Sequence, residues 1–77
     1  MNNGNEDKYG NRQLSYVDYD ELHGFMDVVM SEHPDKLELY SCGDADTVRM
    51  FIGAVMRMSK GHFNPEIVRQ EFDKRLL

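Results

Sequence analysis

The sequence has one cysteine, Cys42, no tryptophan and only two prolines among its 77 residues. A single cysteine cannot form an internal disulfide, so a small secreted fold held together by disulfides is excluded and a reducing compartment is favoured. No apolar run approaches the ~18 residues of a membrane span. The first residues also lack the apolar segment of a signal peptide and the Arg- and Ser-rich character of a transit peptide. We therefore expect a protein that is neither secreted nor associated with a membrane.

Basic residues are also few, but they are unevenly distributed along the chain. The net charge at pH 7 is −5, which by itself argues against a nucleic-acid partner. Residues 1–46 contain eleven acidic and three basic residues, whereas residues 47–77 contain three acidic and six basic ones. The second part of the chain can therefore present a basic face despite the acidic total.

The length allows one small domain at most, because a chain of this size buries only about 60% of the surface it exposes when unfolded. The first fourteen residues are polar, contain several asparagines and glycines, and show no apolar periodicity. We therefore expect a flexible leader over residues 1–16 and a single helical domain over residues 17–77.

The first segment with apolar residues at helical spacing begins after Asp18. Asp18 and Glu21 form a capping-box pattern, which provides partners for the first unpaired backbone N–H groups of a helix. This helix must stop before Pro34, because the residue preceding a proline is disfavoured in the α conformation. Pro34 can then begin a short helical turn that extends to Tyr40. The apolar face of the first helix consists of Leu22, Phe25, Met26, Val29 and Met30.

Two further helices are predicted in the rest of the chain. Asp44 suits the N-cap of a helix that ends at Gly61, where glycine readily adopts the left-handed conformation. Asn64 and Pro65 suit the N-cap and the first position of the last helix. The apolar faces consist of Val48, Phe51, Ile52, Val55 and Met56, and of Ile67, Val68, Phe72 and Leu76. Because no run alternates with the period of a β-strand, the sequence predicts an all-α fold, a small three-helix bundle with a short extra helical turn between helices 1 and 2.

Side chains that could support catalysis or metal binding are few. The three histidines, His23, His33 and His62, have neither the clustering nor the spacing of zinc ligands. We expect His33 at a helix end and His23 exposed to solvent. Cys42 has no activating base near it in the sequence, and a glycine-rich phosphate loop is absent. We therefore expect no metal, no cofactor and no catalytic residue, so that the chain by itself is not an enzyme.

The helix between Asp44 and Gly61 has a basic stripe on its outer side. At about 100° per residue, Lys60, Gly53 and Arg57 all lie within about 80° of Arg49 around the helix axis. One interpretation is a face that contacts phosphates, with Gly53 allowing a close approach of a nucleic-acid backbone. The other is an ordinary solvated face, with Gly53 allowing a neighbouring helix to pack closely. Spacing alone leaves both interpretations open.

The run from Phe51 to Pro65, FIGAVMRMSKGHFNP, resembles the GatB/YqeY domain. This domain is the tail of the GatB subunit of the bacterial and organellar glutamyl-tRNA(Gln)/aspartyl-tRNA(Asn) amidotransferase. The family typically has a glycine, then Val-Met-Lys, then Lys/Arg-Gly, and Asn-Pro at the start of a last helix. The matching features here are Gly53, Val55-Met56-Arg57, Lys60-Gly61 and Asn64-Pro65. Weaker matches upstream are His33-Pro34, Tyr40 and Gly43, so the resemblance covers roughly residues 20–77.

The resemblance implies a non-catalytic domain that contacts the body of a tRNA while the chemistry proceeds elsewhere. Its partners would be tRNA and the other amidotransferase subunits or the rest of the GatB subunit. It would then work in the bacterial cytoplasm or in a mitochondrial or plastid matrix. The implied tRNA contacts are Arg57 and Lys60, and the charge pattern adds Arg49 and Arg69 as candidates. The implied structural residues are Gly53, Met56, Gly61, Asn64 and Pro65.

The chain departs from the family pattern at two positions. Where the family often has a lysine and a small residue, this sequence has His62 and Phe63. His62 stays a candidate nucleic-acid contact, and Phe63 either stacks on a nucleobase or packs under the loop. The acidic first half, the methionines Met50 and Met58, and the pair His62-Phe63 support an alternative function, a helical protein–protein docking module that keeps the fold without binding RNA. The sequence also leaves open whether the chain is a fragment or a free-standing relative.

Overall fold

The computed structural model describes residues 16–77. The leader predicted over residues 1–16 lies outside this part of the chain, except for Tyr16. The described residues form four α-helices and one 3-10 turn and contain no strand, which confirms the prediction of an all-helical fold. The elements are α1 (Tyr19–Glu32), η1 (Pro34–Lys36), α2 (Leu37–Ser41), α3 (Ala45–Met58) and α4 (Pro65–Leu76). The extra helical turn predicted after the first helix corresponds to η1 and α2.

The three long helices begin at the predicted N-caps. The Asp18 carboxylate accepts a hydrogen bond from the Glu21 amide at 3.1 Å, and the Asp44 carboxylate accepts one from the Thr47 amide at 3.0 Å. Before α4, the Asn64 side chain likewise accepts one from the Glu66 amide, at 2.7 Å. Each cap satisfies a backbone donor that has no partner within its own helix, so the local sequence fixes where the helix starts.

The ends of the helices also follow from local chemistry. α1 stops at Glu32, two residues before Pro34. α3 stops at Met58, and the Gly61 amide then donates to the Met56 carbonyl at 2.8 Å. Gly61 has a φ of 74°, and Lys60 before it has a φ of 56°. This left-handed turn is the type of helix end that glycine permits.

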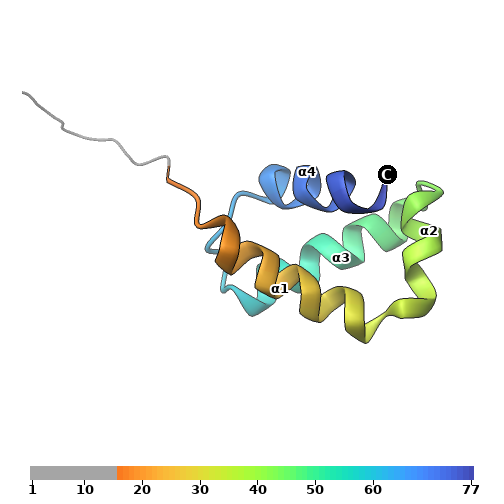
Figure 1. Cartoon of the computed structure of the whole chain (residues 1–77), viewed down its shortest axis with the longest axis horizontal. Helices are drawn as coiled ribbons and strands as arrows, with labels where there is room; N and C mark the ends of the chain where they lie inside the picture. Colours follow the sequence, from red (N-terminus) through yellow and green to blue (C-terminus); the bar gives the residue numbers. More distant parts are fainter. Residues whose placement is uncertain (1–15) are drawn as a thin grey trace, which may run out of the picture.

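The helices are arranged with α3 between α1 and α4 (Figure 1). α1 and α4 run in the same direction and α3 runs in the opposite one. α3 packs against both α1 and α4, and α2 contacts α3 and α4. The loop between α3 and α4 therefore lies at the same end of the molecule as the start of α1, whereas η1 and α2 lie at the other end (Figure 1).

An aromatic cluster occupies the centre of the core. The ring centroids of Tyr40 and Phe51 are 5.4 Å apart, those of Phe51 and Phe72 are also 5.4 Å apart, and Tyr40 and Phe72 are separated by 5.8 Å. These three rings belong to α2, α3 and α4, so they join the last three helices of the chain. The other fully or nearly buried apolar residues are Leu22, Met26, Val29, Val55, Phe63 and Val68.

Candidate nucleic-acid interface

The predicted basic stripe lies on the side of α3 that faces away from the core. Thr47, Phe51 and Val55 form the buried side of the helix. Arg49 and Arg57 are exposed on the outer side, and Lys60 is exposed in the turn that follows. The three cations therefore reach solvent along the length of α3, with Gly53 between the two arginines.

Gly53 is not required for helix packing within residues 16–77. A Cβ atom built at this position would meet only the Nη1 atom of Arg57, at 3.4 Å, which is the flexible end of a long side chain. The close helix–helix contact that was one interpretation of this glycine is therefore absent from the described part of the chain. Glycine in a helix interior lowers helix stability by about 1 kcal/mol relative to alanine. Gly53 therefore destabilises α3, and no packing contact among residues 16–77 requires a glycine there.

Arg57 and Lys60 lie at the end of α3 that is joined to α4. The ion pairs formed among residues 16–77 include neither of them. Lys60 is held at its position by the left-handed turn before Gly61, and its amide donates to the Arg57 carbonyl at 3.2 Å. Their positive charges are therefore not neutralised by carboxylates of the described chain.

Arg49 and Arg69 lie toward the other end of α3 and are paired with acidic residues. Arg49 forms an ion pair with Asp46, and the Arg69 Nε atom is 3.7 Å from an Asp73 oxygen. Both arginines line a groove of about 200 Å³ between α3 and α4. The predicted arginine and lysine contacts thus fall into two groups. The cations at the end of α3 have no carboxylate partner among residues 16–77. Arg49 and Arg69, in contrast, each have an acidic side chain beside them.

Asp73 also anchors the buried Tyr40. The Tyr40 hydroxyl donates to the Asp73 carboxylate at 2.8 Å. Burial of the phenol and this hydrogen bond raise the pKa of Tyr40 well above its usual range. Tyr40 therefore remains neutral, and its role is to hold α2 against α4.

The two residues that depart from the family pattern occupy different environments. The His62 side chain is 65% exposed, and its Nε2 atom is 3.9 Å from a Glu21 carboxylate oxygen. Phe63 is only 6% exposed and meets the Phe25 ring edge-on at a centroid distance of 6.2 Å. Of the two roles considered for Phe63, packing under the loop is therefore the one observed, and its faces do not lie open for stacking.

Four of the five residues predicted to be structural lie in or beside the segment that joins α3 to α4. Met56 is half-buried against the core, and its carbonyl accepts a hydrogen bond from the Gly61 amide. Asn64 caps α4, and Pro65 occupies its first turn, where a missing amide proton costs nothing. These four residues set the path of the loop that carries Lys60 and His62.

A network around the buried Glu71, between α1 and α4, was not predicted from the sequence. Glu71 is 7% exposed. One of its oxygens is 2.8 Å from the His23 Nε2 atom, and the other accepts a hydrogen bond from Lys74 at 2.8 Å. The His23 side chain, which was expected to be exposed, is 35% exposed, because Glu71 holds the imidazole against α4. The sequence contained one indication of this contact, because Glu71 lies on the apolar side of α4 beside Phe72.

The network makes the stability of the domain depend on pH. The hydrogen bonds from Lys74 and His23 lower the pKa of Glu71, and the bond to Glu71 raises the pKa of Lys74. A carboxyl group whose pKa is lower in the folded state contributes stability that is fully present above its unfolded pKa, about 4.3, and is lost as pH falls through the folded value. A lysine whose pKa is raised contributes stability that is lost only as pH rises through that raised value.

Glu71→Gln should therefore lower the melting temperature at pH 7 and reduce its dependence on acid pH. The neutral amide cannot reproduce two charge-assisted hydrogen bonds. The difference between the wild type and the variant should shrink as pH falls from 5 to 3, as followed by thermal circular dichroism. Glu66→Gln, an exposed change on the same helix, is the control. Identical pH profiles for the wild type and Glu71→Gln would contradict this role of the network.

Residues 16–77 offer neither a metal centre nor a membrane-spanning helix. No group of three or more His, Cys, Asp or Glu side chains is placed to share a metal ion there. None of the helices in this part of the chain combines the length and the apolar character needed to cross a membrane.

Comparison with known sequences gives a consistent set of relatives. The sequence profile of the GatB domain matches residues 6–76. The B subunit of an aspartyl/glutamyl-tRNA(Asn/Gln) amidotransferase from Syntrophus aciditrophicus is 39% identical over 67 residues, which is 87% of this chain and 14% of that protein. The corresponding B subunit from Gloeothece citriformis is 34% identical over 70 residues, 91% of this chain and 14% of that protein.

A plant relative carries a narrower name. The B subunit of the chloroplastic/mitochondrial glutamyl-tRNA(Gln) amidotransferase from Ricinus communis is 37% identical over 63 residues, 82% of this chain and 12% of that protein. The chain thus spans 14% or less of the length of these three relatives. No solved structure gives a significant match.

Proposed function

The chain belongs to the GatB domain family, and we propose that it is a non-catalytic tRNA-binding domain of an amidotransferase. In this function it docks the body of a glutamyl-tRNA(Gln) or aspartyl-tRNA(Asn) while other domains carry out the ATP-dependent, glutamine-hydrolysing transamidation. Its protein partners are the rest of the GatB subunit or the other amidotransferase subunits. It acts in protein biosynthesis, in the bacterial cytoplasm or in a mitochondrial or plastid matrix.

The observation that carries this proposal is the exposed pair of cations at the end of α3, in a chain whose relatives are named for tRNA amidation. Arg57 and Lys60 reach solvent on the same side as Gly53 and have no carboxylate partner among residues 16–77. Cations in this arrangement can contact successive phosphates and release counterions from them. Arg49 and Arg69 extend the contact when RNA phosphates compete with Asp46 and Asp73 for them, and His62 is a further candidate contact with the RNA.

The direct test is a titration of the full chain into tRNA(Gln) and into a tRNA for an unrelated amino acid, at about 50 mM and about 200 mM salt. Binding that weakens steeply with salt supports phosphate docking. A preference for tRNA(Gln) measures how far the domain discriminates between tRNAs. Absence of binding at the lower salt concentration contradicts the proposal for the isolated chain.

Gly53 offers a second test, in which stability and binding change in opposite directions. Gly53→Ala should stabilise the domain by up to about 1 kcal/mol, because alanine is the better helix former and the new Cβ meets only the end of Arg57. The same methyl group should weaken tRNA binding, because it occupies the space through which the RNA backbone approaches α3. Thermal melting and the tRNA titration measure the two effects.

Gly24→Ala is the matched control for Gly53→Ala. Gly24 also lies within a helix, α1, and a Cβ there meets nothing within 4 Å. This variant should gain similar stability and bind tRNA like the wild type. If Gly53→Ala also binds like the wild type, RNA does not approach α3 closely at Gly53.

The alternative function is a protein–protein docking module. It is favoured by the pairing of Arg49 with Asp46 and of Arg69 with Asp73, which reduces the positive potential at one end of the stripe. The Met58 side chain is also 37% exposed at the other end of α3. A salt-independent association with other amidotransferase subunits, together with no affinity for tRNA, would favour this alternative.

A further inference from the structure

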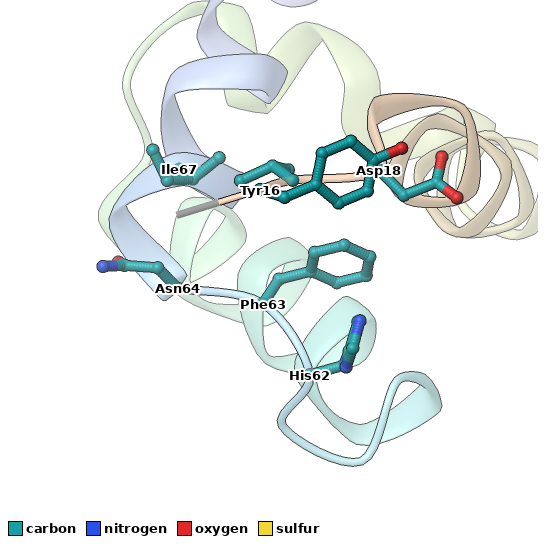
Figure 2. A pocket seen from close by; sticks show the side chains of 7 residues that line it. Tyr16, Asp18, His62, Phe63, Asn64 and Ile67 are labelled. Carbon is teal, nitrogen blue, oxygen red and sulfur yellow. The ribbon is translucent and has the colours of Figure 1, made fainter. Parts of the chain in front are cut away.

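A pocket of about 390 Å³ lies where the chain enters α1 and faces the loop between α3 and α4. Val17, Phe63 and Ile67 supply its apolar surface, and Tyr16, His62 and Asn64 contribute aromatic and polar groups. In Figure 2 the Tyr16 ring lies above the Phe63 ring, and His62 lies below Phe63. The pocket is therefore formed by segments more than forty residues apart in the sequence.

We propose that this pocket binds an unpaired nucleobase of the RNA that docks on α3. The inference rests on the proposed function and specifies it, because a base can enter the pocket only from a loop, bulge or single-stranded end. Base-paired RNA presents its base faces to their stacked neighbours, so recognition of this type requires an unstacked nucleotide.

The aromatic side chains support this choice of ligand. Tyr16 is 86% exposed, so its ring is available as a stacking platform at the mouth of the pocket. Phe63 is nearly buried and forms, together with Val17 and Ile67, the apolar inner surface. Stacking on an aromatic ring is the usual way in which proteins hold unpaired bases.

The charges around the pocket favour a base inside it and a phosphate outside it. Asp18 lines the pocket, and the Glu21 carboxylate is 3.9 Å from His62. These two carboxylates repel a phosphate group, whereas a neutral base can donate its amino or imino protons to a carboxylate. Lys60 precedes His62 by two residues in the same loop and is exposed, so it can hold the phosphate of the nucleotide whose base enters.

The test compares adenosine monophosphate with ribose 5-phosphate, which carries the same phosphate without a base. Each is titrated at millimolar concentration into the isotope-labelled full chain and followed by amide NMR spectra. Adenosine monophosphate should shift the amide signals of His62, Phe63 and Ile67, and ribose 5-phosphate, which can contact only Lys60, should shift them much less. Equal shifts with the two compounds, or no shifts with either, would overturn the proposal.

A pair of tyrosine variants extends the test to tRNA. Tyr16→Ala removes the platform and should weaken tRNA binding by about fivefold or more, as expected for the loss of one stacked base. Tyr19→Ala is the control, because Tyr19 is also exposed but does not line the pocket. If the wild type binds tRNA and Tyr16→Ala binds it with the same affinity, the base pocket is refuted and the proposed function is unaffected. Absence of all tRNA binding refutes the proposed function, and the nucleotide comparison then decides the pocket separately.

Discussion

Replacing both Arg57 and Lys60 with alanine should weaken tRNA binding by about tenfold or more and leave the helical content unchanged. The change removes the two proposed charge-assisted contacts with phosphates, and the slope of log affinity against log salt should therefore fall by about 2. The fold should be preserved because both side chains are exposed. Alanine is the best helix former at Arg57, and Lys60 already adopts the positive φ that alanine would adopt there.

The control for this double variant removes the same charge elsewhere. Lys36 lies in η1, and Arg75 forms an ion pair with Asp27 of α1 at 2.5 Å, so neither belongs to the stripe on α3. Lys36→Ala with Arg75→Ala should bind tRNA nearly as the wild type does. Equal losses of tRNA affinity in the two double variants would show that binding depends only on the net charge of the domain. Unfolding of the Arg57/Lys60 variant would show that these residues are structural.

Phe51→Ala should destabilise the domain by about 3–5 kcal/mol, the usual cost of truncating a buried phenylalanine. Phe51 is fully buried and contacts the aromatic rings of Tyr40 and Phe72. A core of this size rarely supplies more than about 3–5 kcal/mol in total. The variant should therefore be largely unfolded at 25 °C, as measured by circular dichroism at 222 nm and by urea titration, and it should lose tRNA binding together with its structure.

Met58→Ala is the comparison for the core variant. Met58 lies on the same helix but is 37% exposed, and its replacement should change the free energy of unfolding by less than about 0.5 kcal/mol. A Phe51→Ala protein that melts cooperatively within a few degrees of the wild type would show that α2, α3 and α4 are held together by contacts other than this cluster.

The local sequence was sufficient to predict the helices. Asp18, Asp44 and Asn64 each cap the helix that was expected to follow. The helix that was expected to end at Gly61 stops at Met58, and Gly61 belongs to the left-handed turn that follows it. These features are predictable because a cap or a left-handed turn depends on residues within about four positions of one another. The apolar spacing then identified the side of each helix that faces the core.

The arrangement of charges could be predicted only in part. The helical period placed Arg49, Gly53 and Arg57 on one side of α3. The ion pair of Arg49 with Asp46 also lies within one helical turn, yet spacing does not tell whether two exposed side chains meet. The contact of His23 with Glu71 joins residues 48 positions apart, and no local rule predicts it.

The sequence by itself determined the all-helical fold, the starts of the three long helices, the family and the side of α3 that bears the basic residues. The tertiary structure decided that Phe63 is buried, that Glu71 joins α1 to α4, and that Tyr16 and His62 border one pocket. The difference has a physical reason. Helix formation depends on backbone hydrogen bonds between near neighbours, whereas burial and pockets depend on which distant side chains the packing of the helices brings together.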